Sequence, residues 1–239
     1  MNKDLIQARF LKSLKHYNEN AKVQKKMAEK VFNLIKNKSF NNILEIGCGT
    51  GFLTRLVSDN LDFKNYKAID IVSDCESYIK EINSSINFEV ADIEQFIKDS
   101  SETFDLIISN ASLQWVSNFD NVIKELIKKL SSNGELIIST FGQENFREIY
   151  NIEGTTLKYY SINELKVMFP KAEINPEIHI MAFDNPKDVL KHLQLTGVNG
   201  IENKIWTKKD LIKFENAYKN ICPRRPTLTY NPIYIKILK

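Results

Sequence analysis

Apolar residues recur every three or four positions along the first forty residues of the chain. They are Ile6, Phe10 and Leu14 in a first segment, and Val23, Met27, Val31 and Leu34 in a second. A polar stretch at 16–20 separates the two segments. This spacing predicts two amphipathic helices, each with one apolar face to bury. Because they precede the first strand, these helices must pack over the sheet or over a ligand.

From residue 42 onward, short apolar runs alternate with helical spacing. Strands are predicted at 42–46, 66–70, 86–90, 104–109 and 135–140, and helices at 51–61, 74–83 and 119–130. Strands that alternate with helices indicate a parallel sheet with right-handed crossovers, covered by helices on both faces.

The alternation changes after residue 141. Helices are predicted at 161–169, 186–196 and 207–219, and strands at 173–183 and 230–238. We therefore expect an α/β fold with a sheet of about seven strands, mostly parallel with an antiparallel end. A single domain (1–239) would comprise an N-terminal helical lid (1–40), a ligand-binding core (41–183), a helical cap (184–229) and a last strand (230–239).

The composition is that of an ordinary globular chain. Of 239 residues, 43% are apolar and 26% charged, and no 18-residue apolar run would cross a membrane. The N-terminus lacks the pattern of a signal peptide, so we expect a cytoplasmic protein. Cys48, Cys75 and Cys222 are odd in number and far apart, and the three histidines are scattered. Neither a disulfide framework nor a metal site is expected.

A glycine-rich turn follows the first predicted strand. Residues 44–51 read Leu-Glu-Ile-Gly-Cys-Gly-Thr-Gly and precede a helical pattern. Gly47, Gly49 and Gly51 would let a ligand approach the backbone, and the following helix offers unpaired N–H groups. The dinucleotide fingerprint requires a third small residue at position 52, which is Phe, so dinucleotide binding is disfavoured. A purely structural glycine turn remains the alternative.

Three carboxylates are candidates for contacting a nucleotide-like ligand. Asp70 ends the second predicted strand nineteen residues after Gly51, close to the spacing of about 20 at which an acid meets ribose hydroxyls. Asp92 follows the third strand and could accept from an exocyclic amine, with Ile93 flanking the ring; its alternative role is a helix N-cap. Glu45 could hold the ammonium group of a ligand, because burial without a partner would be costly.

These motifs resemble those of class I S-adenosylmethionine (SAM) methyltransferases. Glu45 to Gly51 resembles their first motif, and the resemblance continues through Asp70, Ala91-Asp92-Ile93, residues 104–107 and the Asn-x-x-Leu-Gln-Trp segment at 110–115. It covers roughly residues 40–141 and implies SAM as the cofactor. The candidate cofactor-binding residues are Tyr17, Glu45, Gly47, Gly49, Gly51, Asp70, Ile71, Asp92, Ile93 and Asn110.

Flanking segments resemble a narrower family, the malonyl-acyl-carrier-protein O-methyltransferases of biotin synthesis (the BioC family). The matching residues are Tyr17, Ala21, Gln24, 190–199 and 228–230. The resemblance implies that Tyr17 contacts the methionine end of SAM, whereas a tyrosine between two helices is otherwise typically a packing residue. Cys75 departs from the methionine expected there, which affects the packing around the adenosine.

Such an enzyme transfers a methyl group to the free carboxylate of a malonyl thioester. Carboxylic acids ionise near pH ~4, so no general base is required. Gln114, Trp115 and Tyr230 are candidates for the wall of the substrate pocket, with core packing as the alternative. Arg147, Arg225 and His192 are candidates for the donor that holds the substrate carboxylate.

The expected function is therefore SAM-dependent methylation of malonyl-acyl carrier protein. The alternatives are methylation of another small carboxylic acid or metabolite, and a SAM-binding assembly subunit without turnover. The net charge of +3 is unevenly distributed. Residues 1–40 include ten basic and three acidic residues, and residues 191–225 include eight basic and three acidic residues. A basic rim on the lid and cap would attract an acidic carrier protein, although solvated helix faces would look the same. Nucleic acid is not expected as a partner.

Overall fold

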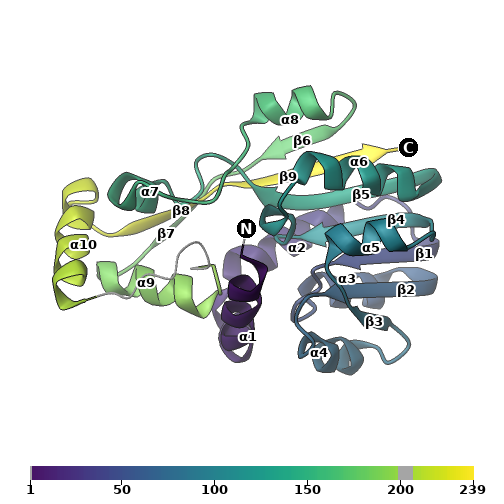
Figure 1. Cartoon of the computed structure of the whole chain (residues 1–239), viewed down its shortest axis with the longest axis horizontal. Coiled ribbons are helices and arrows are strands. Elements are labelled where there is room, and N and C mark those ends of the chain that lie inside the picture. Colours follow the sequence, from purple (N-terminus) through teal and green to yellow (C-terminus); the bar gives the residue numbers. More distant parts are fainter. Residues whose placement is uncertain (1, 199–206) are drawn as a thin grey trace.

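Seven strands of the described chain form one sheet in the order β3-β2-β1-β4-β5-β9-β6 (Figure 1). The computed structural model describes residues 2–198 and 207–239. The strands are β1 (Ser39–Ile46), β2 (Asp62–Asp70), β3 (Asn87–Val90), β4 (Phe104–Asn110), β5 (Leu130–Phe141), β6 (Glu173–Pro176) and β9 (Pro232–Leu238). β1 to β5 pair in parallel, and β9 is antiparallel to both β5 and β6. The predicted fold class is confirmed.

Helices cover both faces of this sheet because its central strands are apolar on both sides. Successive strand residues point to opposite faces: Ile43 and Leu106 belong to one core, and Leu44 and Ile107 to the other. The first core includes α2 (Lys22–Asn33), α3 (Phe52–Asn60) and α4 (Cys75–Ile82). The second includes α5 (Ile93–Asp99), α6 (Phe119–Lys129) and α8 (Ile162–Met168).

Two strands predicted as continuous are each divided in the structure. The segment predicted at 173–183 forms β6 and then β7 (His179–Ala182), and the last strand forms β8 (Thr227–Tyr230) and then β9. β7 pairs with β8 in a separate two-stranded sheet. Asn231 lies at the second break, where its side chain accepts a hydrogen bond from the Glu144 N–H and donates one to Glu177 O. Tyr230 therefore ends β8 and does not begin the last strand.

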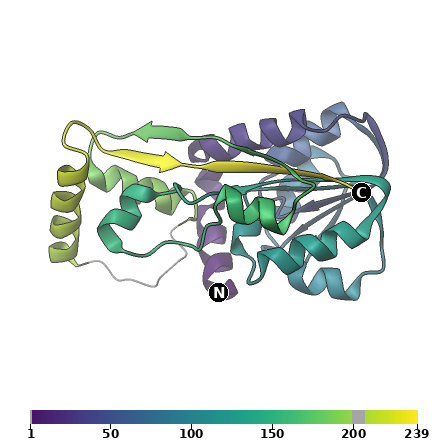
Figure 2. The ribbon, with the colours of Figure 1, turned by 90° about the horizontal axis from the view of Figure 1, so that it is seen from above.

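The cap differs from the helical insertion predicted at 184–229. It contains the β7–β8 sheet and α7 (Arg147–Glu153) as well as α9 (Pro186–Leu195) and α10 (Lys208–Ile221). Figure 2 shows β7 and β8 extending from the main sheet to α10 at the far end of the cap. Neither α7 nor α5 was predicted, and each is seven residues long.

Helix α1 (Lys3–Asn20) lies between the core and the cap (Figure 1). A Cβ atom at Gly197, just after α9, would lie 3.3 Å from Phe10 Cα and 2.9 Å from Ser13 Oγ, so α1 passes very close to the cap. At its other side, the Asn18 Oδ1 atom accepts a hydrogen bond from the Thr50 hydroxyl in the glycine turn at 2.5 Å. Helix α1 thus touches both halves of the molecule.

Candidate active site

The glycine turn joins β1 to α3 at the carboxyl edge of the sheet. Gly47, Gly49 and Gly51 all have positive φ, at 66°, 53° and 82°. A Cβ at Gly47 would lie 2.3 Å from the Ser112 Cβ, and one at Gly49 would lie 3.2 Å from the Phe10 ring. The turn is therefore packed against the end of β4 on one side and against α1 on the other, which only glycine permits.

A cavity of about 1190 Å³, counted to its open mouth, lies above this turn and beneath α1. The structure brings the following predicted site residues to its wall: Tyr17, Glu45, Gly47, Gly49, Asp70, Ile71, Asp92, Ile93, Asn110, Gln114 and Trp115. Gly51 is absent from the wall; it forms the left-handed N-cap of α3.

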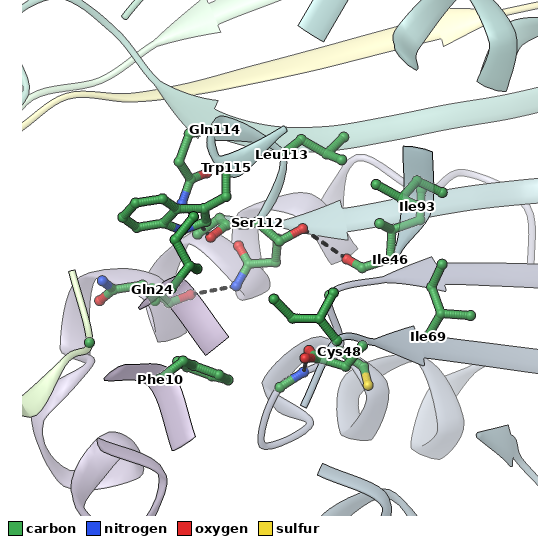
Figure 3. Close-up of a pocket in the computed structure, with 18 of the residues that line it drawn as sticks. Phe10, Gln24, Ile46, Cys48, Ile69, Ile93, Ser112, Leu113, Gln114 and Trp115 are labelled. Atoms are coloured by element: carbon green, nitrogen blue, oxygen red, sulfur yellow. Dashed lines mark hydrogen bonds between the residues drawn. The ribbon is translucent and has the colours of Figure 1, made fainter. Parts of the chain in front are cut away.

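The cavity has two ends that differ in their side chains. In Figure 3, Ile69 and Ile93 lie at one end, whereas Gln24, Gln114 and Trp115 lie at the other, which we call the polar end. The first end also carries carboxylates, because Asp70 and Asp92 adjoin Ile69 and Ile93 in the chain.

Asp70 is buried at the end of β2 and holds the backbone of the turn. Its two carboxylate oxygens accept hydrogen bonds from the Gly49 N–H and the Val72 N–H, each at 2.9 Å. Burial raises the pKa of Asp70, and these backbone donors lower it in part. Asp70 therefore supports the glycine turn besides lining the cavity.

Glu45 is a second buried carboxylate, with only 1% of its surface exposed. Its Oε2 atom accepts hydrogen bonds from the Tyr66 hydroxyl at 2.5 Å and the Thr54 hydroxyl at 2.7 Å. Burial raises the pKa of Glu45 to about 7, although the Tyr66 and Thr54 donors lower it in part; the charge of Asp70 raises it further. None of the described basic side chains is paired with Glu45, so a cationic group of a ligand would stabilise its charged form.

The position of Asp92 is compatible with both of its expected roles, a helix N-cap and a ligand contact. Its Oδ1 accepts from the Glu94 N–H at 2.9 Å and so caps α5. Its Oδ2 is paired with Lys3 at the start of α1, and Lys3 also contacts Glu94 at 2.5 Å. Lys3 lines the cavity and was not predicted as a site residue, because nothing in the sequence links it to a residue 89 positions away.

The polar end of the cavity is held by α2 and by the segment after β4. The Asn110 amide donates to the Gln24 carbonyl oxygen at 3.0 Å and accepts from the Ser139 hydroxyl at 2.7 Å. Gln24 is 2% exposed, and its side-chain oxygen has no hydrogen-bond partner. The side-chain oxygen of Gln114 is also buried without a partner. Two unpaired acceptors on one wall are costly unless a ligand satisfies them.

Tyr17 lines the cavity from α1, and its ring is packed edge-on against Phe10, with centroids 5.1 Å apart. It is also 5.8 Å from the ring of Phe52. Burial and the nearby Asp70 charge raise the pKa of the Tyr17 hydroxyl. The ligand contact and the packing role are therefore compatible, and the contact stays a prediction.

Four of the predicted pocket residues lie outside the cavity wall. Arg147 pairs with Glu144, and Arg225 pairs with Asp184 on the cap surface. Tyr230 is fully buried behind the wall, and its hydroxyl lies 2.7 Å from His192 Nε2. Burial lowers the pKa of His192 to about 4, so a neutral imidazole supports Tyr230 from the cap. The structure thus brings none of these four side chains to the proposed substrate.

Within the described residues, no group of three or more His, Cys, Asp or Glu side chains is arranged to hold a metal ion. No helix in the described ranges is long and apolar enough to cross a membrane.

Comparisons with known proteins agree with this geometry. Residues 17–176 match the family described as "Methyltransferase domain". A putative methyltransferase structure from Bacillus halodurans superimposes with a TM-score of 0.63 at 13% identity, covering 89% of this chain and 98% of that one. The N-methyltransferase NodS from Bradyrhizobium japonicum, solved with S-adenosyl-L-homocysteine, superimposes with a TM-score of 0.51 at 13% identity, covering 91% of this chain and 86% of that one. At these identities the likeness concerns the fold alone.

Sequence relatives extend over nearly the whole chain. A malonyl-[acyl-carrier protein] O-methyltransferase from Calditerrivibrio nitroreducens is 36% identical over 238 residues, which cover 96% of this chain and 94% of the relative. An enzyme of the same name from Acinetobacter baylyi is 32% identical, and the match covers 98% of this chain and 96% of the relative. The match includes the lid and the cap as well as the core. The chain therefore belongs to the malonyl-[acyl-carrier protein] O-methyltransferase family, within the larger methyltransferase-domain family.

Proposed function

We propose that this protein is a SAM-dependent O-methyltransferase that methylates the free carboxylate of a malonyl group carried by acyl carrier protein, at the start of pimelate assembly for biotin. The observation that carries the proposal is the family match across the cap as well as the core. A cofactor site alone is common to all methyltransferases, whereas the cap is the part that would differ between substrates. A cytoplasmic location belongs to the same proposal.

The cavity offers suitable groups for each part of SAM. Asp70 would accept from the ribose hydroxyls, Asp92 from the adenine amine, and Glu45 from the ammonium group. Ile71 and Ile93 would flank the adenine ring, and Tyr17 would contact the methionine end. The glycine turn has no Cβ atoms to obstruct the ligand. When bound, SAM supplies a methyl group on a positively charged sulfur, which a carboxylate oxygen accepts while the sulfur becomes a neutral thioether.

The protein's own contribution to this reaction is to align the reactants and to exclude water. The acceptor carboxylate is already ionised at neutral pH, since such groups titrate near pH ~4. Opposite charges on the reactants are neutralised as the methyl group moves, so a water-poor wall favours the transition state. Phe10, Trp115 and Phe141 supply such a wall. No proton has to be removed, so the reaction needs no general base.

Methylation of a different small carboxylic acid remains an alternative, and so does SAM binding without turnover. The test is to mix purified protein with methyl-labelled SAM and each of three acceptors: malonyl carrier protein, malonyl coenzyme A and free malonate. We expect base-labile label on the malonyl thioesters and faster labelling of the carrier protein. Label on another acid only, or SAM binding without label transfer, would support an alternative.

An Asp70→Ala variant tests the proposed cofactor site in the same assay. Removing a charged acceptor should weaken SAM binding by about 2 kcal/mol, measured by calorimetry, and should lower the label transfer at low SAM concentration. The melting temperature should also fall, because the Gly49 N–H loses its partner.

A further inference from the structure

A small side chamber adjoins the main cavity beyond Gln114 and Trp115. Phe141 and Val198 are also shared by the two spaces, whereas Asn145, Phe146 and Tyr159 line the chamber only. The chamber therefore lies on the β5 side of the polar end of the cavity, between the segment after β4 and the start of α7. None of its residues was predicted as a site residue except Gln114 and Trp115.

The hydrogen bonds of Asn145 determine the direction of the Tyr159 hydroxyl. Asn145 is 1% exposed, and its side-chain oxygen accepts from the Asn231 N–H at 3.2 Å. Its amide nitrogen must then be the group that faces Tyr159, and it donates to the Tyr159 oxygen at 2.9 Å. That leaves the proton of the Tyr159 hydroxyl to be donated elsewhere. Within the described residues, Tyr159 is the donor in no hydrogen bond of the structure.

Strained backbone occurs on both sides of the chamber. Phe146, on its wall, has φ 58° and ψ 33°, and Ala111, at the end of β4 beside Gln114, has φ 50°. A left-handed conformation is unusual for a bulky residue and costs on the order of 1–3 kcal/mol. Such strain is concentrated at functional sites, where it fixes side chains in one place. Here it fixes the two segments that bound the chamber.

Three polar side chains around the two spaces have unused hydrogen-bonding capacity. Gln24, on the main cavity, and Gln114, on the shared wall, each have an unpaired buried acceptor. Tyr159, on the chamber only, has an unused donor. The Tyr159 hydroxyl is therefore a group that could serve an anionic ligand. Lys3 is the one charged basic side chain that lines either space among the described residues, and it is already paired with Asp92 and Glu94.

We propose that the carboxylate that is methylated lies where the side chamber opens into the main cavity, and that the Tyr159 hydroxyl, oriented by Asn145, donates a hydrogen bond to it. This rests on the proposed function. The chamber itself has room for little more than one water molecule. A neutral donor suits the reaction better than an arginine. A cation would stabilise the ionised carboxylate more than the transition state, in which its charge is being lost, and would slow the transfer. A neutral hydroxyl also positions the carboxylate, but it stabilises the ionised ground state less than a cation would, so it raises the activation barrier less.

The test compares Tyr159→Phe, which removes only the hydroxyl, with Asn145→Asp. In Asn145→Asp, the new carboxylate keeps the bond from the Asn231 N–H and accepts the Tyr159 proton, so the donor is lost to the substrate. Both variants should raise the KM for malonyl coenzyme A about ten- to a hundredfold. Tyr160→Phe is the matched control, because the Tyr160 ring packs on Phe119 away from both spaces.

A binding measurement separates this role from a structural one. With S-adenosylhomocysteine present, calorimetry should give about ten- to a hundredfold weaker binding of malonyl coenzyme A to Tyr159→Phe. Affinity for S-adenosylhomocysteine itself, and for the methyl ester of malonyl coenzyme A, should stay near the wild-type values. If Asn145→Asp fails to fold, the binding of malonyl coenzyme A to Tyr159→Phe alone tests the proposal.

Three outcomes would overturn the proposal. If active wild-type enzyme and Tyr159→Phe bind malonyl coenzyme A equally, the Tyr159 hydroxyl does not hold the carboxylate. If the methyl ester loses affinity as much as the acid, Tyr159 contacts the thioester instead. If wild-type protein binds S-adenosylhomocysteine but methylates no malonyl acceptor, the proposed function fails, and the acceptor site fails with it.

Discussion

Glu45 and Asp70 are two buried carboxylates on one cavity wall, and their partners give them different properties. Asp70 is held by two backbone N–H groups, which stabilise its charged form against the effect of burial. Glu45 is held by two hydroxyl groups, and its pKa is raised to about 7. A carboxylate with that pKa changes its charge near neutral pH, so its contribution to ligand binding should depend on pH.

We predict that SAM affinity rises about tenfold between pH 5.5 and 7. In the free protein, Glu45 is protonated below about pH 7, and the ammonium group of SAM, which stays charged below about pH 7.7, favours the ionised form. Binding at pH 6 should therefore release a proton. Calorimetry in buffers of different ionisation enthalpy measures both the affinity and the proton released.

Glu45→Gln is the control for this titration. A neutral amide of the same size should bind SAM weakly and equally at all pH values in the window. The ligand-free wild type should lose stability as pH rises from about 4.3 to 7, because the folded pKa lies above the unfolded one; Glu45→Gln should not. A wild-type affinity that stays flat across this window would mean that Glu45 is no ammonium ligand.

Helix α1 is the element that closes the cavity, although little of it is buried. Only Ile6, Ser13 and Leu14 are buried among its eighteen residues. Near its N-terminal end, Lys3 is paired with Asp92 and Glu94, and the Gln7 amide donates to the Ile71 carbonyl oxygen at 2.6 Å. An element with few buried contacts opens at low free-energy cost.

We predict that Lys3→Met increases the dissociation rate of SAM several-fold. The variant removes the ion pairs that hold the end of α1 over the cavity. Because such partly exposed pairs contribute only about 0.2–1 kcal/mol to stability, the melting temperature should change little. Stopped-flow displacement of SAM measures the rate, and Lys12→Met, an exposed change on the same helix, is the control. Slower dissociation would instead mean that Lys3 competes with the ligand for Asp92.

At the scale of the whole molecule, basic charge lies at the end of the cap farthest from the sheet. Lys208, Lys209 and Lys213 are exposed on α10, which lies at that end in Figure 1. A large acidic partner would reach this surface, whereas a small thioester in the cavity would not. Docking of the carrier protein here remains a prediction, and α10 is a site where it can be tested without altering the cavity.

Charge reversal of these three lysines to Glu should raise the KM for malonyl carrier protein several-fold and leave that for malonyl coenzyme A nearly unchanged. The difference should shrink at high salt, since exposed charges are screened. Glutamates near the N-terminus of α10 agree with the helix dipole, so folding should be unaffected. Reversal of the exposed Lys98, Lys166 and Lys171 on the core is the control. Equal effects on both substrates would exclude α10 as the docking surface.

Much of the fold and half of the site could be predicted from sequence, because those features are local. Apolar runs determine the buried strands, and the glycine turn with Asp70 nineteen residues later follows from one strand-helix-strand unit. Carboxyl ends of parallel strands meet at one edge, so residues that end the strands, such as Glu45, Asp92 and Asn110, reach one cavity. Residue type and spacing are sufficient for such inferences.

Only the tertiary structure decided the features that depend on distant segments. The strand expected at 173–183 is divided because its two halves pair with different partners, β9 and β8. Tyr230 and His192 lie behind the wall, since the β8 strand and the α9 helix that carry them pack together and bury both side chains. The Lys3–Asp92 pair and the Asn145–Tyr159 donor need segments brought together by packing. Local spacing carries no information about which distant side chains will meet, because that depends on how all the elements pack at once.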